Sequence, residues 1–97
     1  MLDLSQPCQF DWDEGNFKKN LIRHGIECRE AEEAFSDENS LLKDDIKHSL
    51  SEKKYYLVAK GNTNKLLTLV FTVRKNKIRI ISARVANKKE RSAYEQN

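Results

Sequence analysis

The chain has 97 residues, of which 18 are Lys or Arg and 15 are Asp or Glu, for a formal net charge of +3 at pH 7. This length supports one hydrophobic core and excludes a second folded module. No apolar run approaches the roughly 20 residues that cross a bilayer, and the N-terminus lacks the basic and apolar regions of a signal peptide. We therefore expect a soluble cytoplasmic protein with no membrane partner, in which residues 1–9 are a loose leader and residues 10–97 form one domain.

Two helices are predicted in the N-terminal part. The segment Phe10-Asp-Trp-Asp13 alternates aromatic and acidic side chains, so both rings point to one side and Asp13 is placed to cap a helix. A first helix is predicted over residues 13–24, followed by Gly25 as a residue able to adopt positive φ. The spacing of apolar side chains predicts a second, short amphipathic helix over residues 27–35.

Beyond Ser40 the apolar period shifts toward two, and β-branched and aromatic residues become frequent. Strands are predicted over residues 55–59, 66–73 and 78–85, with an additional edge strand over 41–44. The spacers at 61–64 and 75–77 are short enough for hairpins, so these strands are expected to form an antiparallel meander. A closing helix is predicted over 88–96, with Asn87 as its N-cap and Glu90 completing a capping box.

Alternation along the two long strands predicts one apolar face and one polar face. On the first of these strands the apolar set is Leu67, Leu69, Phe71 and Val73, opposite Thr68, Val70, Thr72 and Arg74. On the second strand, Ile81, Ala83 and Val85 are expected to oppose Ile80, Ser82 and Arg84. Arg79 is therefore expected on the face opposite Arg84, where a structural or partner-facing role is favoured.

Charge is divided unevenly along the chain. Residues 1–52 carry six Lys/Arg and thirteen Asp/Glu, a net charge of −7, whereas residues 53–97 carry twelve and two, a net charge of +10. Such asymmetry is typical of a protein that binds nucleic acid or an acidic protein surface. The last twenty residues, a cationic strand followed by a cationic helix with a tyrosine, indicate a phosphate-rich partner.

No motif indicates a cofactor or a metal site. Cys8 and Cys28 are too far apart for a CxxC motif and too few for a disulfide framework, so both are expected to be free thiols. The three glycines form no nucleotide-binding loop, and no HxH, HExxH or carboxylate cluster has metal-ligand spacing. His24, in the last turn of the first predicted helix, is interpreted as a partner of the helix dipole.

Several separated motifs resemble the BrnT family of type II toxins over residues 10–96. They are Phe10-Asp-Trp-Asp13, Asn20-Leu-Ile-Arg-His-Gly25, Ala31-Glu-Glu-Ala-Phe-Ser-Asp37, His48-Ser49 with Glu52, Ile78-Arg-Ile-Ile-Ser-Ala-Arg84 and Glu90-Arg-Ser-Ala-Tyr-Glu95. The last two are the specific ones. The chain departs from the family pattern at Lys54-Tyr55, where an arginine-tyrosine pair is usual, at Ala59-Lys-Gly61, where Ile-Gly is usual, and at Lys75-Asn-Lys77, where a Gly-rich hairpin is expected.

The resemblance implies a RelE-like α+β fold: an antiparallel three- to four-stranded sheet with two N-terminal helices packed on one face and a C-terminal helix at its margin. It also implies a ribonuclease toxin that inhibits translation by cleaving RNA. Its expected partner is a BrnA-like ribbon-helix-helix antitoxin, through which alone the complex would touch operator DNA.

Cleavage of RNA without a metal requires a base for the 2′-hydroxyl proton, a donor for the leaving 5′-oxygen and cations for the phosphate. Arg84 and Arg91 are the leading phosphate binders, because guanidinium groups form paired hydrogen bonds to phosphate. His48 is the candidate general acid or base, and Tyr94 is a candidate to stack on a base or orient the nucleophile. The alternatives are salt bridges of the arginines to Glu90 or Glu95, a solvated loop histidine, and a tyrosine ring packed on the sheet edge.

Further phosphate contacts are expected from a second set of polar side chains. This set is Lys53, Lys54, Arg74, Arg79, Ser82 and Lys88. A non-catalytic module that uses the same basic surface to bind nucleic acid or a protein is the alternative function. It would lose RNA affinity as cations are removed and would be insensitive to replacement of His48.

Overall fold

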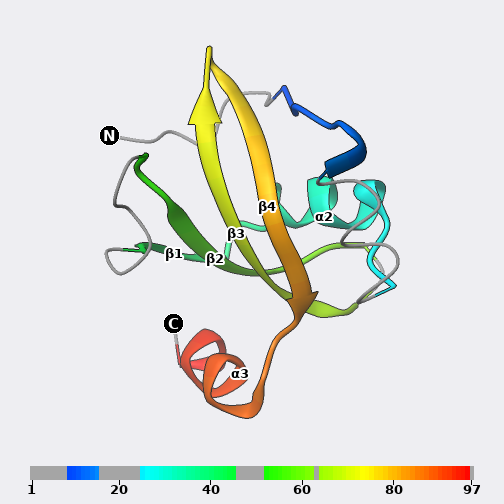
Figure 1. The fold of residues 1–97 in the computed structure, drawn as a ribbon. Coiled ribbons are helices and arrows are strands. Elements are labelled where there is room, and N and C mark those ends of the chain that lie inside the picture. The colour runs from blue at the N-terminus through cyan, green and yellow to red at the C-terminus, as the bar shows by residue number, and fades with distance from the viewer. Residues whose placement is uncertain (1–8, 16–24, 46–51, 63, 97) are drawn as a thin grey trace.

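The computed structural model describes residues 9–15, 25–45, 52–62 and 64–96, which form an α+β fold (Figure 1). The elements in chain order are α2 (Cys28–Ala34), β1 (Leu41–Asp44), β2 (Tyr55–Lys60), β3 (Leu66–Arg74), β4 (Lys77–Val85) and α3 (Lys88–Glu95). The four strands form one antiparallel sheet in the order β1-β2-β3-β4. The predicted meander, its edge strand and its closing helix are thus confirmed.

The segment before α2 extends the sheet beyond β4. Phe10 forms a parallel bridge with Ile78, because Asp11 N–H donates to the Ile78 carbonyl and Ile78 N–H donates to the Gln9 carbonyl, each at 2.8 Å. Phe10 and Trp12 both pack against the core, as their alternation with acidic residues predicts. This segment therefore covers part of the outer edge of β4.

A single helix covers the apolar face of the sheet among the described residues. Helix α2 packs on β2 and β3, and its small Ala31 and Ala34 side chains allow close approach. Among the described residues, the expectation of two N-terminal helices on this face is corrected to one helix ahead of the sheet and one after it. Phe10 and Trp12, which are partly buried, also pack against the core on this side. Of the helix predicted over residues 13–24, only residues 13–15 are described, of which Glu14 and Gly15 are helical; the rest lies outside the described residues.

The core lies between α2 and the sheet. Its buried members are Ile26, Ala31, Ala34, Phe35, Leu57, Ala59, Leu67, Leu69, Phe71, Ile78, Ile80 and Ala83. Phe35 packs edge-on against Phe10 at 5.3 Å and against Phe71 at 4.9 Å between ring centroids, and Tyr55 stacks on Phe71. These aromatic contacts join the N-terminal segment, α2 and the sheet centre into one core.

A β-bulge in β4 changes which side chains share a face. Ser82 pairs with Val70, but Phe71 pairs with Ile80, so Ile81 is one extra residue on β4. The alternation of side chains between the two faces therefore shifts by one residue at the bulge. As a result, Ile78 and Ile80 before the bulge and Ala83 after it all lie in the core. The sequence prediction that Arg79 opposes Arg84 is wrong, because it assumed an uninterrupted period of two.

Local residue choice explains both ends of β4. The β3–β4 hairpin turns through Lys75 and Asn76, which both have positive φ, the combination required by a type I′ turn. At the other end, Asn87 accepts a hydrogen bond from Glu90 N–H, and the Glu90 side chain accepts one from Asn87 N–H. The predicted capping box is thus confirmed, and α3 lies past the end of β4 (Figure 1).

No helix among the described residues is long and apolar enough to span a membrane.

Candidate functional site

The face of the sheet opposite α2 carries hydroxyl and guanidinium groups. Directly paired residues of an antiparallel sheet point to the same side, so the pairs Thr68–Arg84, Val70–Ser82 and Thr72–Arg79 share this side. Tyr56 pairs with Val70 and joins them. We call this surface the polar face and define it by Tyr56, Thr68, Val70, Thr72, Arg74, Arg79, Ser82 and Arg84.

A buried carboxylate organises one end of the polar face. Arg84 forms two parallel hydrogen bonds to Glu90, from Nη1 to Oε1 and from Nη2 to Oε2, both at 2.7 Å. Thr68 Oγ1 donates to Oε1 at 2.9 Å, and the Tyr56 hydroxyl donates to Oε2 at 2.5 Å. With the Asn87 N–H, these contacts form what we call the Glu90 network, which fixes α3 on the sheet.

The Glu90 network keeps its carboxylate ionised. Burial opposes ionisation, but the hydrogen bonds from Arg84, Tyr56, Asn87 and Thr68 outweigh it and lower the pKa of Glu90 to about 2. Burial and the same carboxylate raise the pKa of Tyr56 to about 12. At neutral pH, Glu90 is therefore a charged acceptor already engaged by five donors, which makes it a poor general base.

Arg84 combines fixation with access to solvent. Its side chain is 38% exposed, whereas that of Glu90 is 9% exposed. A guanidinium has five N–H donors, and the two short bonds to Glu90 and a long contact of 3.5 Å to the Val85 carbonyl leave others for an external ligand. Arg84 is thus fixed by its salt bridge to Glu90 while part of its guanidinium stays open to solvent.

The other two arginines of the polar face are also paired with carboxylates. Arg79 lies 3.0 Å from Asp13 and 3.7 Å from Asp11. Arg74 donates two hydrogen bonds to Glu52, at 2.6 and 2.9 Å, and these bonds lower the pKa of Glu52. These carboxylates reduce the net positive charge that the polar face presents.

The remaining predicted phosphate contacts are spread over the molecule. Lys53 lies beside β2, 3.8 Å from Asp44 and 5.4 Å from the centre of the Tyr55 ring, and Lys54 is half-buried next to it. Ser82 is half-buried on the polar face, and Lys88 is exposed in the first turn of α3. The polar face thus brings together Arg74, Arg79, Ser82 and Arg84, while Lys53 and Lys54 immediately precede β2 and Lys88 lies on α3.

The predicted residues of α3 occupy different surroundings. Tyr94 lies one turn after Glu90, on the same side of the helix, and its hydroxyl donates to Asp37 Oδ2 at 2.6 Å. Burial and this carboxylate raise the pKa of Tyr94 to about 12. Arg91 is exposed and makes no recorded ion pair within the described part of the chain. His48 lies outside the described residues.

Asp37 fixes the second contact of α3. Besides Tyr94 it accepts hydrogen bonds from the backbone N–H groups of Lys60 and Asn39, each at 2.9 Å. Burial would raise the pKa of Asp37, but the bonds from Tyr94, Lys60 and Asn39 outweigh it and lower this pKa. Because Glu90 is the one buried residue of α3, the helix is held mainly by polar contacts.

Replacing Tyr94 with phenylalanine is therefore expected to destabilise the protein without altering its core. Loss of the bond to a charged acceptor should lower the free energy of unfolding by about 1.5 kcal/mol. Urea denaturation measures this difference. Asp37→Asn should be less than additive with Tyr94→Phe, since both changes weaken the same contact. An unchanged denaturation midpoint in Tyr94→Phe would contradict this view of the helix.

Sequence reasoning missed two members of the Glu90 network, Tyr56 and Thr68. Alternation predicted Thr68 on the polar face but gave it no partner, and Tyr56 was assigned to a strand but to neither face. Glu90 was identified through its capping box and as one possible salt-bridge partner of Arg84, and neither signal indicates its contacts with Tyr56 and Thr68. The contact between a helix and strands 22 and 34 residues away along the chain depends on tertiary structure.

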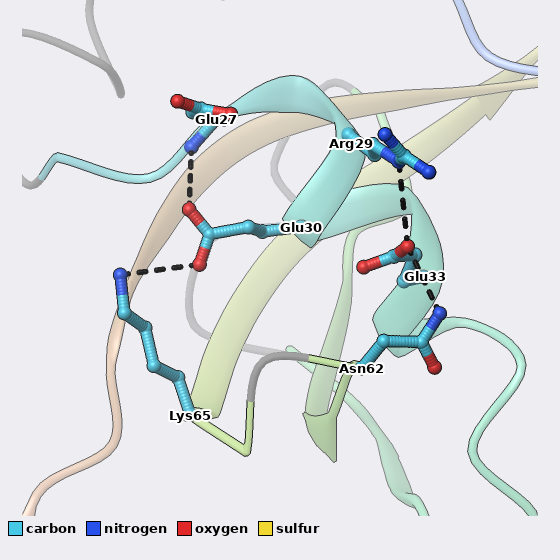
Figure 2. A pocket seen from close by; sticks show the side chains of 6 residues that line it. All are labelled: Glu27, Arg29, Glu30, Glu33, Asn62 and Lys65. Atoms are coloured by element: carbon cyan, nitrogen blue, oxygen red, sulfur yellow. Dashed lines mark hydrogen bonds and ion pairs between the residues drawn. The ribbon is translucent and has the colours of Figure 1, made fainter.

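A separate depression of about 410 Å³ lies on the α2 side of the molecule (Figure 2). It is lined by Glu27, Arg29, Glu30, Glu33, Asn62 and Lys65. Its charged groups are paired with one another: Glu30 with Lys65 at 3.2 Å and Glu33 with Arg29 at 3.6 Å. Asn62 also donates to Glu33. We interpret this depression as a joint between α2 and the β2–β3 turn.

No group of three His, Cys, Asp or Glu side chains suited to a metal ion occurs among the described residues.

These features define a small α+β protein whose open sheet face carries oriented arginines, a class of surface suited to phosphate. No curated protein gives a significant match to the sequence. The sequence does match the family model described as "Ribonuclease toxin, BrnT, of type II toxin-antitoxin system" over residues 12–90. The chain therefore belongs to the BrnT family, as the motif resemblance predicts, and this family identifies a ribonuclease toxin with an antitoxin partner and an RNA target.

Proposed function

We propose that this protein is a metal-independent endoribonuclease that inhibits translation by cleaving RNA at the polar face. The observation that carries this proposal is Arg84, whose guanidinium is held by Glu90 in two short bonds while part of it stays open to solvent. A cation fixed before substrate binds stabilises the charge that develops on a phosphate without reorganising during the reaction. This is the role that a metal ion would otherwise have.

In the proposed reaction, the 2′-hydroxyl of one nucleotide attacks the adjacent phosphate and the 5′-oxygen of the next nucleotide leaves. Arg84 stabilises the charged phosphate oxygens, with Arg91 as a second cation from α3. The engaged state of Glu90 argues against a carboxylate base in the network, so we assign proton transfer to His48. Tyr94 is proposed to orient the nucleotide from α3.

The rest of the RNA chain is proposed to follow the cationic side chains around this point. These side chains are the cations Lys53, Lys54, Arg74, Arg79 and Lys88, and the Ser82 hydroxyl is proposed as a neutral donor among them. For Arg74 and Arg79, a phosphate would exchange with the carboxylates that now accept their hydrogen bonds, Glu52 and the Asp11–Asp13 pair. Exchange of one anion for another keeps each guanidinium paired, so it has a small cost.

The proposed partner is a BrnA-like ribbon-helix-helix antitoxin that covers the polar face and binds operator DNA itself. The RelE-like arrangement, the single domain from residue 10 and a cytoplasmic location belong to the same proposal. They are supported by the family match and by the antiparallel sheet with its closing helix.

Cleavage of a labelled RNA by the purified protein in EDTA tests the proposed function. We expect cutting to persist in EDTA, to stop when the antitoxin is added and to fall strongly in His48→Ala. Binding of the same RNA should be little changed in that variant. RNA that is bound but left intact by the wild-type protein would favour a non-catalytic binding module, for which the carboxylate pairing of all three face arginines is the supporting observation.

A further inference from the structure

Tyr56 lies within the sheet on the polar face, on the second of its four strands. It pairs with Val70 of β3 on one side and with Lys43 of β1 on the other. It is half-buried, and its hydroxyl is bound to Glu90 at 2.5 Å. Because one end of the ring is fixed by this bond and the other by the strand, its orientation is set before any ligand arrives.

Tyr56 and the neighbouring Tyr55 point to opposite faces of the sheet, and only Tyr55 packs against the core. Tyr55 points to the apolar face and stacks on Phe71, with 5.3 Å between ring centroids. Tyr56 makes no such ring contact in the part of the chain that the structure describes. The ring therefore lies on a polar, arginine-bearing surface, where no aromatic side chain of the described residues packs on it.

The ring of Tyr56 is held next to Arg84, the residue proposed to bind phosphate. Its hydroxyl and Arg84 Nη2 bind the same oxygen of Glu90, at 2.5 and 2.7 Å. The two donor atoms are therefore no farther apart than the sum of these distances. In single-stranded RNA a base and its own phosphate have a similar adjacency, and proteins that bind such strands combine a cationic groove with aromatic platforms.

We propose that Tyr56 stacks on a base of single-stranded RNA while Arg84 binds the adjacent phosphate. The hydroxyl has a positioning role: it fixes the ring through Glu90 and makes no contact with RNA. This inference rests on the proposed function, because it names the part of an RNA substrate that the polar face recognises besides phosphate. Stacking of this kind tolerates any base, since every base has an aromatic face.

The test compares two oligonucleotides of equal length and charge at a fixed salt concentration. One is 2′-O-methyl oligouridine, which lacks the attacking hydroxyl and is not cut, and the other is the same chain without bases. The wild-type protein should bind the first about tenfold more tightly than the second. This preference should disappear in Tyr56→Leu and persist in Tyr56→Phe, which keeps the ring.

The ratio of the two affinities is independent of the folded fraction of a variant, so a loss of stability cannot imitate the result. Tyr56→Trp provides a second readout: in a Trp12→Phe background its fluorescence should be quenched by the oligonucleotide with bases and not by the abasic one. A wild-type preference that survives in Tyr56→Leu, or is lost in Tyr56→Phe, would overturn the assignment of Tyr56 alone. Failure of the wild-type protein to bind either oligonucleotide would overturn this assignment and the RNA-binding function together.

Discussion

Replacement of Arg84 with alanine is expected to lower the rate of RNA cleavage by about 100- to 1,000-fold. Removal of one fixed donor from the charge that develops in a transition state has an effect of this size in other enzymes. Arg84→Lys should recover only part of the rate, because an ammonium group keeps the charge but loses the paired hydrogen bonds to Glu90. Single-turnover cleavage of a labelled RNA measures both variants.

Arg29→Ala is the matched control for Arg84. Arg29 is an exposed arginine on α2, on the opposite side of the sheet, and its ion pair with Glu33 is at the surface. Its removal changes the net charge equally but should leave cleavage within about twofold of the wild-type rate. Arg84→Ala also leaves the buried carboxylate of Glu90 without its cationic partner, which lowers stability. Rates are therefore compared at temperatures where circular dichroism shows the variant folded. Wild-type cleavage by folded Arg84→Ala would restrict Arg84 to a structural role.

Replacement of Glu90 is expected to have the largest effect on stability. Glu90→Ala removes the acceptor of Arg84, Tyr56 and Thr68, and all three hydrogen bonds are at least partly buried. Breaking a buried, hydrogen-bonded ion pair on one side typically costs about 3 kcal/mol or more. Denaturant unfolding should show a loss of about 3 kcal/mol, whereas Glu95→Ala, at an exposed position of the same helix, should change the free energy by less than about 0.5 kcal/mol.

The same carboxylate makes stability depend on pH. The pKa of Glu90 falls from its ordinary value of 4.5 to about 2 on folding, so the folded state binds fewer protons. The stabilisation by Glu90 is therefore complete above about pH 4.5 and is lost as the pH falls toward about 2. Asp37, whose pKa is also lowered, acts in the same direction. Thermal unfolding from pH 7 to pH 2 should show this decline. A pH profile in Glu90→Gln as steep as that of the wild type would contradict the assignment.

Much of the fold was predictable because its signals are local. The strand boundaries follow from period-two alternation, and the predicted edge strand over residues 41–44 coincides with β1. The capping box of α3 and the positive φ of Gly25 depend on residues close in sequence. The face assignment of Arg79 was not predictable, because the bulge at Ile81 arises from the pairing of β4 with β3. The candidate site was predicted only in part: Arg84 was identified with Glu90 as one possible partner, but the contacts of Glu90 with Tyr56 and Thr68 were not.

The amino-acid sequence by itself determined the elements, the charge division and membership of the BrnT family, since propensity, periodicity and motif spacing act over short stretches of chain. Tertiary structure alone decided that Arg79 and Arg84 share a face, that Glu90 joins α3 to β2, β3 and β4, and that Tyr56 lies beside Arg84. These relations depend on strand register and helix docking, which bring together side chains far apart in the sequence. Hydrogen bonding within a buried network then selects which of them meet.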